Sequence, residues 1–177
     1  MKKVIPIIIA VIILLLFISN NKKDYYIIPD ESIRLRIIAN SNSITDQFIK
    51  NTTKKQIESV LIEDISLNSS IDEVRTKIKN NLPKYESVIR DTFKNENYDK
   101  DFTISYGNNY FPEKKYKGVV YQEGMYESLY IEIGEAKGDN WWCCLFPPIC
   151  SLEVSEAKDV EYRFFIKDII NKYLLKK

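Results

Sequence analysis

Residues 33–50 have the sequence IRLRIIANSNSITDQFIK, an alternating stretch followed by a polar connector and then by a helical pattern. From Ser32 to Ile37 apolar and polar side chains alternate, which is the period of a half-buried β-strand. The connector, residues 39–43, is rich in residues whose side-chain oxygens cap helices. Ser43 and Asp46 have the spacing of a capping box, so we expect a helix from Ile44 to Ile65. Its buried stripe should consist of Phe48 or Ile49, Thr53, Ile57, Val60, Leu61 and Ile65.

The next segment predicts two more helices on either side of a proline. Ser70 and Glu73 repeat the capping-box spacing, and apolar residues follow at helical intervals: Ile71, Val74, Ile78 and Leu82. Because proline disfavours helical geometry in the residue before it, we expect Pro83 to end this helix. A third amphipathic helix should follow, with these side chains inward: Tyr85, Val88, Ile89 and Phe93. A last helix is expected over residues 159–174.

The second half of the chain has the patterning of strands. Residues 102–106 and 126–133 alternate, and residues 141–146 form a short apolar run. Residues 107–109 have turn composition, and the turn at 134–138 should join the last two strands in a hairpin. These elements predict an α+β domain, with a small mixed or antiparallel sheet of three to four strands packed against about four helices.

An N-terminal hydrophobic segment precedes this domain. Lys2 and Lys3 stand before an uninterrupted apolar run from Val4 to Ile18. This pattern is typical of a secretory signal peptide, although residues 19–21 make a poor cleavage site. An uncleaved membrane anchor formed by residues 4–18 is the alternative. In both cases residues 1–23 engage the membrane during export, and residues 24–177 form a single domain outside the cytoplasm.

The composition argues against several classes of function. The formal net charge is +1, and without the four lysines of residues 1–23 it becomes −3, so no basic face for nucleic acid is implied. The chain contains no histidine. This absence removes Ser-His and Cys-His catalytic pairs and every histidine-ligated metal site. We therefore expect no cofactor and no metal.

Residues 138–150, GDNWWCCLFPPIC, contain both tryptophans and all three cysteines of the chain. Outside the cytoplasm cysteines are more often bridged than metal-bound, and zinc would need four sulfur or imidazole ligands where only three exist. A bridge between the neighbours Cys143 and Cys144 would strain the peptide that joins them. Either Cys143 or Cys144 should therefore pair with Cys150, which would contribute roughly 2.5 kcal/mol. Three free thiols in an anaerobic organism are the alternative.

The paired tryptophans should lie on opposite faces of their strand, because adjacent strand residues point to opposite sides. One of Trp141 and Trp142 should be in the core. The other is either exposed, where it would suit a partner surface, or covered by the final helix. Coverage of both within the monomer is the alternative.

Catalytic motifs are weak. Ser155 and Lys158 match Ser-x-x-Lys, but the companion motifs of the penicillin-recognising hydrolases are missing. Glu132 and Glu135 could form an acid–base pair, yet Glu132 has an outward strand position that favours a solvated carboxylate. We predict no catalytic residues and no enzyme. An exported hydrolase that uses these groups, and a membrane-anchored structural protein, are the alternatives.

Three stretches, in order, resemble the stage II sporulation protein R family of endospore-forming Gram-positive bacteria. They are IRLRIIANSNSITDQFIK at 33–50, MYESLYIEIGEAKGDNWWCCLFPPIC at 125–150 and EYRFFIKDII at 161–170. Cys144 stands where the family more often has an aliphatic residue, which supports a disulfide between Cys143 and Cys150. Asp139 stands where a histidine is commoner, so no basic role is transferred to that position.

The resemblance implies a signalling protein rather than a catalyst. Such proteins are exported from the forespore into the space between two membranes. There they activate a membrane-embedded aspartic-type protease, which processes the precursor of sigma factor E in the mother cell. Because loops at strand ends tend to carry function, we expect the partner surface to include two segments: Asn40, Ser41, Asn42 and Ser43, and Asn140, Trp141, Trp142, Pro147 and Pro148.

Overall fold

The computed structural model describes residues 26–28, 30–65, 69–116, 119–149 and 167–172. Its elements in chain order are β1 (Tyr26–Ile27), β2 (Ile33–Ile38), α2 (Ile44–Asp64), α3 (Ile71–Asn95), β3 (Phe102–Phe111), β4 (Lys114–Tyr116), β5 (Val119–Tyr121), β6 (Gly124–Ile133) and β7 (Asn140–Phe146). The expected signal peptide or anchor, residues 1–23, lies outside the described ranges. Within them, no helix is both long and apolar enough to cross a membrane.

The main sheet is mixed, with strand order β3-β6-β2-β7. β2 pairs in parallel with β6 and antiparallel with β7, while β3 pairs antiparallel with β6 along ten residues. The hairpin predicted for the last two strands is therefore wrong, because β2 lies between β6 and β7. The connection from β6 to β7, residues 134–139, has to cross the end of β2.

β3 is longer than the sequence indicated. Gly107-Asn108-Asn109 does not close the strand, since the ladder to β6 continues without a break to Phe111. Asn109 Nδ2 donates to Ser128 Oγ at 2.9 Å across this pair. Pairing with a long neighbouring strand overrides the turn propensity of these residues.

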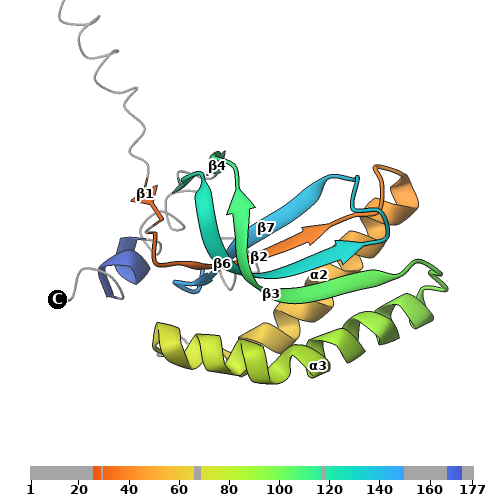
Figure 1. Ribbon diagram of the computed structural model, residues 1–177, viewed down its shortest axis with the longest axis horizontal. Helices are drawn as coiled ribbons and strands as arrows, with labels where there is room; N and C mark the ends of the chain where they lie inside the picture. The colour runs from red at the N-terminus through yellow and green to blue at the C-terminus, as the bar shows by residue number, and fades with distance from the viewer. Residues whose placement is uncertain (1–25, 29, 66–68, 117–118, 150–166, 173–177) are drawn as a thin grey trace, which may run out of the picture.

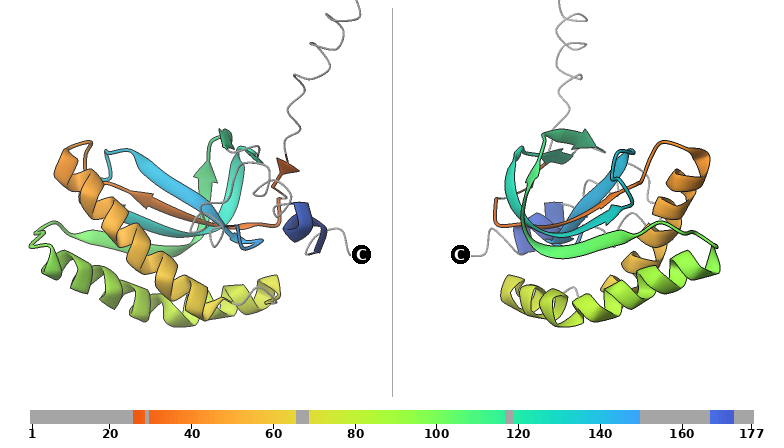
Figure 2. Two further views of the ribbon diagram at one scale, coloured as in Figure 1. Left: turned by 180° about the vertical axis from the view of Figure 1, so that it is seen from behind. Right: turned by 45° about the vertical axis from the view of Figure 1, so that its right-hand side comes forward.

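The two long helices cover one face of the main sheet (Figures 1 and 2). Ser43 caps α2 by accepting a hydrogen bond from the Asp46 backbone, and Ser70 and Glu73 form a complete capping box at the start of α3. The helices bury the predicted apolar stripes against the sheet: Ile49, Thr53, Ile57 and Leu61 of α2, and Val74, Ile78, Tyr85, Ile89 and Phe93 of α3. Both predicted N-termini are confirmed.

Pro83 does not end a helix. It lies inside α3, which runs for 25 residues, so the two helices predicted around it are one. Pro83 is on the solvent-exposed side. Buried residues on either side of it, Ile78 and Tyr85, keep both halves of the helix against the same sheet, and this packing outweighs the local preference of the chain.

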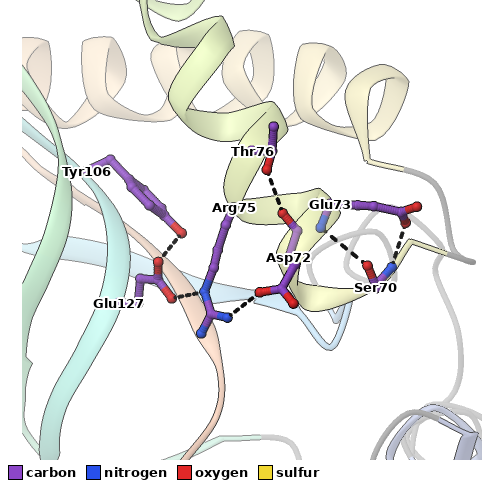
Figure 3. A network of polar contacts seen from close by, with 7 residues as sticks. All are labelled: Ser70, Asp72, Glu73, Arg75, Thr76, Tyr106 and Glu127. Atoms are coloured by element: carbon purple, nitrogen blue, oxygen red, sulfur yellow. Dashed lines mark hydrogen bonds and ion pairs between the residues drawn. The ribbon is translucent and has the colours of Figure 1, made fainter.

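A polar network ties the start of α3 to the sheet (Figure 3). Arg75 donates from Nε to Glu127 Oε2 at 2.7 Å and from Nη1 to Asp72 Oδ1 at 2.8 Å. Glu127, on β6, also accepts from the hydroxyl of Tyr106, on β3, at 2.8 Å. Burial and the neighbouring Glu127 raise the pKa of Tyr106, so its hydroxyl stays a donor. The network fixes how α3 is placed along the two strands.

The other face of the main sheet is partly covered by a three-stranded sheet of order β1-β5-β4. This side has its own apolar cluster, formed by Ile28, Phe111, Val119, Tyr121, Tyr126, Trp142, Cys144, Ile149 and Ile169. Ile169 lies in the helical segment 167–172, the part of the expected last helix that the structure describes. The predicted fold class, a mixed sheet with helices, is confirmed.

Candidate functional site

The loop after β2 is joined to the connection between β6 and β7. Asn40 Nδ2 donates to Asp46 Oδ2 at 2.8 Å, while its Oδ1 accepts from the Glu135 backbone at 3.0 Å. The backbone adds two bonds, from Lys137 N to Asn40 O at 3.1 Å and from Gly138 N to Ala39 O at 2.9 Å. We call residues 39–43 and 134–139 together the loop pair.

Asp46 is the centre of this arrangement. Its carboxylate accepts hydrogen bonds from the Ser41 hydroxyl, from Asn40 and, at 2.7 Å, from the Tyr98 hydroxyl beyond α3. Hydrogen bonds from Ser41 and Tyr98 are the main causes that lower the pKa of Asp46 to about 2. A carboxylate that is ionised at neutral pH therefore holds the loop against the first turn of α2, where the helix dipole also favours it.

Asn42 makes the second link within the loop pair. Its Oδ1 accepts from the Asp139 backbone at 2.6 Å and from Gln47 Nε2 at 3.1 Å. Lys50 then bridges the helix and the connection by donating to Gln47 Oε1 at 2.6 Å and to Asp139 O at 3.1 Å. The loop is thus fixed at both of its asparagines.

Two glycines allow the close approach within the loop pair. Gly134 has φ +57, and a Cβ there would lie 2.2 Å from Asn40 Oδ1. A Cβ on Gly138 would lie 2.3 Å from the carbonyl oxygen of Ser41. At Gly138 the clash would be with backbone, so a side chain there would push the two loops apart. At Gly134 a side chain would displace the Asn40 side chain, and the positive φ also favours glycine.

Among the predicted partner residues, Asn140 begins β7, and Pro147 and Pro148 follow the end of the same strand. In the register of β2 and β7, Asn140 faces Ile38 and Phe146 faces Ile33. Asn140 is therefore exposed beside the loop pair, whereas Pro147 and Pro148 are buried at the opposite end. The structure brings Asn40, Ser41, Asn42, Ser43 and Asn140 together and places the proline pair away from them.

The two tryptophans face opposite sides of the sheet, as predicted. Trp141 is half-buried against the helix-side core, with Lys54 Nζ 4.2 Å from its ring centroid. Trp142 is 9% exposed and belongs to the cluster on the other face, which also contains Ile169 of the C-terminal helical segment. Most of the surface of both rings is therefore used inside the chain.

Cys144 is a buried free thiol, as the resemblance implied. Its Sγ donates to Phe146 O at 2.9 Å, and burial raises its pKa to about 12. Cys150 lies outside the described residues, so the disulfide between Cys143 and Cys150 stays a prediction.

Exposed apolar side chains beside the loop pair were missed by sequence reasoning. Ile44 is 92% exposed and Phe48 is 53% exposed, one turn apart on α2. The stripe of α2 left Phe48 and Ile49 as alternatives for the core, and the structure buries Ile49. Because Ile44 directly follows the helix cap, its full exposure could be found only once the orientation of α2 was known.

The carboxylates weighed as an acid–base pair have other contacts. Glu132 accepts from Thr103 Oγ1 at 3.2 Å, and Glu135 forms an exposed ion pair with Lys137 at 2.7 Å. Ser155 and Lys158 lie outside the described residues. Among the residues that the structure does describe, no group of three or more acidic or cysteine side chains could hold a metal ion.

Comparisons with known proteins agree on one family. The family model described as stage II sporulation protein R matches residues 29–156. The curated stage II sporulation protein R of Bacillus subtilis (strain 168) is 36% identical over 135 residues, which cover 76% of this chain and 60% of that relative. No solved structure matches the chain. The chain belongs to the stage II sporulation protein R family.

Proposed function

We propose that this chain is an exported sporulation signal that activates a membrane-embedded aspartic-type protease. In this proposal the forespore exports it into the space between two membranes, and the protease then processes the precursor of sigma factor E in the mother cell. Membership of the stage II sporulation protein R family carries the proposal. Since the chain spans only about 60% of its curated relative, the activity and the partner are proposals for this chain.

The geometry supports a role in protein recognition. The loop pair presents a surface held by side-chain and backbone hydrogen bonds, so little conformational entropy would be lost when a partner binds it. Beside it, Ile44 and Phe48 offer apolar area that the fold itself does not bury. We place the contact surface at the loop pair, Asn140 and these two side chains.

The proposal assigns an indirect role to the segment after β7, which contains Pro147 and Pro148. Pro147 and Pro148 are buried, and Trp142 packs in the cluster on the far face, so their contribution to binding would be to hold β7 and Asn140 in place. A disulfide between Cys143 and Cys150 would brace the same segment. Activation then follows if the chain binds the active arrangement of the protease more tightly than the inactive one.

The test is co-expression of this chain with the presumed protease and the sigma precursor in a host that does not sporulate. We expect precursor cleavage only when all three are present. Cleavage that is equally fast without this chain, or absent with it, would contradict the proposal. Chain variants with alanine at Glu132, Ser155 or Lys158 should activate normally, and a loss with unchanged folding would favour an exported hydrolase.

A further inference from the structure

Arg34, on β2, is completely buried on the sheet face opposite the helices. Aromatic rings surround its guanidinium: the Cζ atom lies 3.3 Å from the centroid of Tyr126, 5.1 Å from Phe111 and 5.6 Å from Trp142. Such rings attract a cation through their π faces. They do not accept hydrogen bonds as a carboxylate does.

The guanidinium of Arg34 makes few polar contacts in the part of the chain that the structure describes. Nη2 donates to the backbone oxygen of Gln122 at 3.2 Å, whereas Nε and Nη1 have no hydrogen-bond partner. Among the described residues no ion pair involves Arg34. Cys144 lies across the strand pair, but with a pKa of about 12 it is an uncharged thiol at neutral pH.

An arginine in this state is costly for the fold. Each unsatisfied buried donor costs about 1–3 kcal/mol, and a buried charge without a partner costs more. Burial lowers the pKa of Arg34 accordingly. An apolar side chain of similar length would pack among the same rings without this penalty. The charge of Arg34 would therefore serve to bind a group that completes its hydrogen bonds.

Arg36 extends the cationic face toward the surface. It follows Arg34 by two residues on the same face of β2, and the Phe111 ring lies within 5.7 Å of both guanidinium carbons. Arg36 is half-buried; its Nη1 donates to Tyr110 O at 3.2 Å and its Nε has no partner. Three guanidinium nitrogens on one face, Nε and Nη1 of Arg34 and Nε of Arg36, are thus buried without a hydrogen-bond partner.

We propose that Arg34 and Arg36 form a binding site for a carboxylate carried by a partner polypeptide. A planar carboxylate has two oxygens, which suit a few guanidinium donors, and its single charge would neutralise the buried cation. A phosphate dianion would bring more charge and more acceptors than the apolar lining could satisfy. The assignment does not depend on the protease being that partner.

The test is a titration of the full-length chain with the peptide acetyl-Gly-Glu-Gly-amide. Trp141 and Trp142 are the two tryptophans of the chain, so fluorescence reports on β7, and the guanidinium Nε–H resonances report on the arginines directly. We expect the peptide to shift the Nε–H signal of Arg34 and to change the emission. Its neutral match, acetyl-Gly-Gln-Gly-amide, should do neither.

Substitutions then identify the site. R34M should weaken binding of the Glu peptide at least tenfold, while R90M, which removes an exposed arginine paired with Glu86 on α3, should bind as the unmodified chain does. If R34M does not fold, R36Q replaces it, with binding expected to weaken several-fold. The proposal is overturned if the Glu and Gln peptides act alike, if the folded variant binds normally, or if inorganic phosphate binds and the Glu peptide does not. Co-expression tests the proposed function separately.

Discussion

Asp46 stabilises the loop after β2 through a charge that the surrounding donors keep ionised. Ser43 and Asp46 were predicted as partners in a helix cap from their spacing alone, and that contact is present. The contacts that give Asp46 its importance come from Ser41 and Tyr98, the latter 52 residues away in the chain. Local spacing therefore predicted the position of this residue but not its main role.

Replacing Asp46 with asparagine should lower the free energy of unfolding by about 3 kcal/mol at pH 7, because hydrogen bonds to an ionised group contribute about 1.5–3 kcal/mol each. A pKa lowered from 3.8 to about 2 in the folded chain means that the carboxylate stabilises the fold above pH 4. This stabilisation is lost as the pH falls from about 4 toward 2. Urea unfolding at pH 7 and pH 2.5 measures both effects, and an equal difference between the two proteins at both pH values would contradict this account.

At the scale of single elements, α3 shows where local signals and packing disagree. Pro83 has no backbone N–H that could donate to the carbonyl oxygen of Lys79, yet the helix continues from Ile71 to Asn95. Pro83, which lacks this hydrogen bond, lies on the exposed side of α3, while the buried side keeps an unbroken apolar stripe. Sequence patterns predicted the apolar stripes before and after Pro83 correctly, but they could not show that both stripes belong to one continuous helix.

Replacing Pro83 with alanine should therefore stabilise the chain. The substitution restores a helical hydrogen bond and removes a steric conflict, which together cost a helix about 3 kcal/mol. The greater freedom that alanine gives the unfolded chain offsets part of this gain in stability. We expect a gain of about 2 kcal/mol, visible as a higher midpoint in thermal unfolding followed by circular dichroism. N80A, at an exposed position of the same helix, is the matched control and should change stability by less than about 0.7 kcal/mol. A lower midpoint for P83A would mean that the bend itself is needed.

The close approach at Gly138, in the connection between β6 and β7, should be needed for the stability of the fold. A Cβ at position 138 would meet backbone atoms of Ser41 at 2.3 and 2.6 Å, so G138A should separate the loop pair and destabilise the fold by about 2 kcal/mol or more. G107A is the control within the same sheet, because a Cβ there meets nothing within 4 Å and the residue is in an extended strand. Denaturant unfolding of the two variants should give clearly different midpoints, and equal midpoints would show that the loop pair can open at little cost.

Over the whole molecule, sequence patterns predicted most elements but not their neighbours. The strands near 33–38, 126–133 and 140–146 were found, whereas the insertion of β2 between β6 and β7 was not, because hydrophobic alternation carries no information on strand order. That insertion brings Asn40 and Asn140 together and buries Arg34 under a second sheet. The loop half of the candidate site was therefore predictable, and the arginine face was not.

The proposed contact surface can be separated from the stability of the whole molecule. Ile44 and Phe48 are 92% and 53% exposed, so the double variant I44S/F48S should lower the free energy of unfolding by no more than about 1.5 kcal/mol, most of it from the half-buried Phe48. If a partner buries these side chains, the same variant should reduce precursor cleavage in the co-expression assay at least tenfold, since two buried apolar anchors are lost. I62S, at an apolar position of α2 that is 47% exposed and more than three turns away, should leave both stability and cleavage unchanged. Normal cleavage with I44S/F48S would remove this end of the molecule from the contact, whereas equal losses in I44S/F48S and I62S would indicate that the partner covers the whole exposed side of α2.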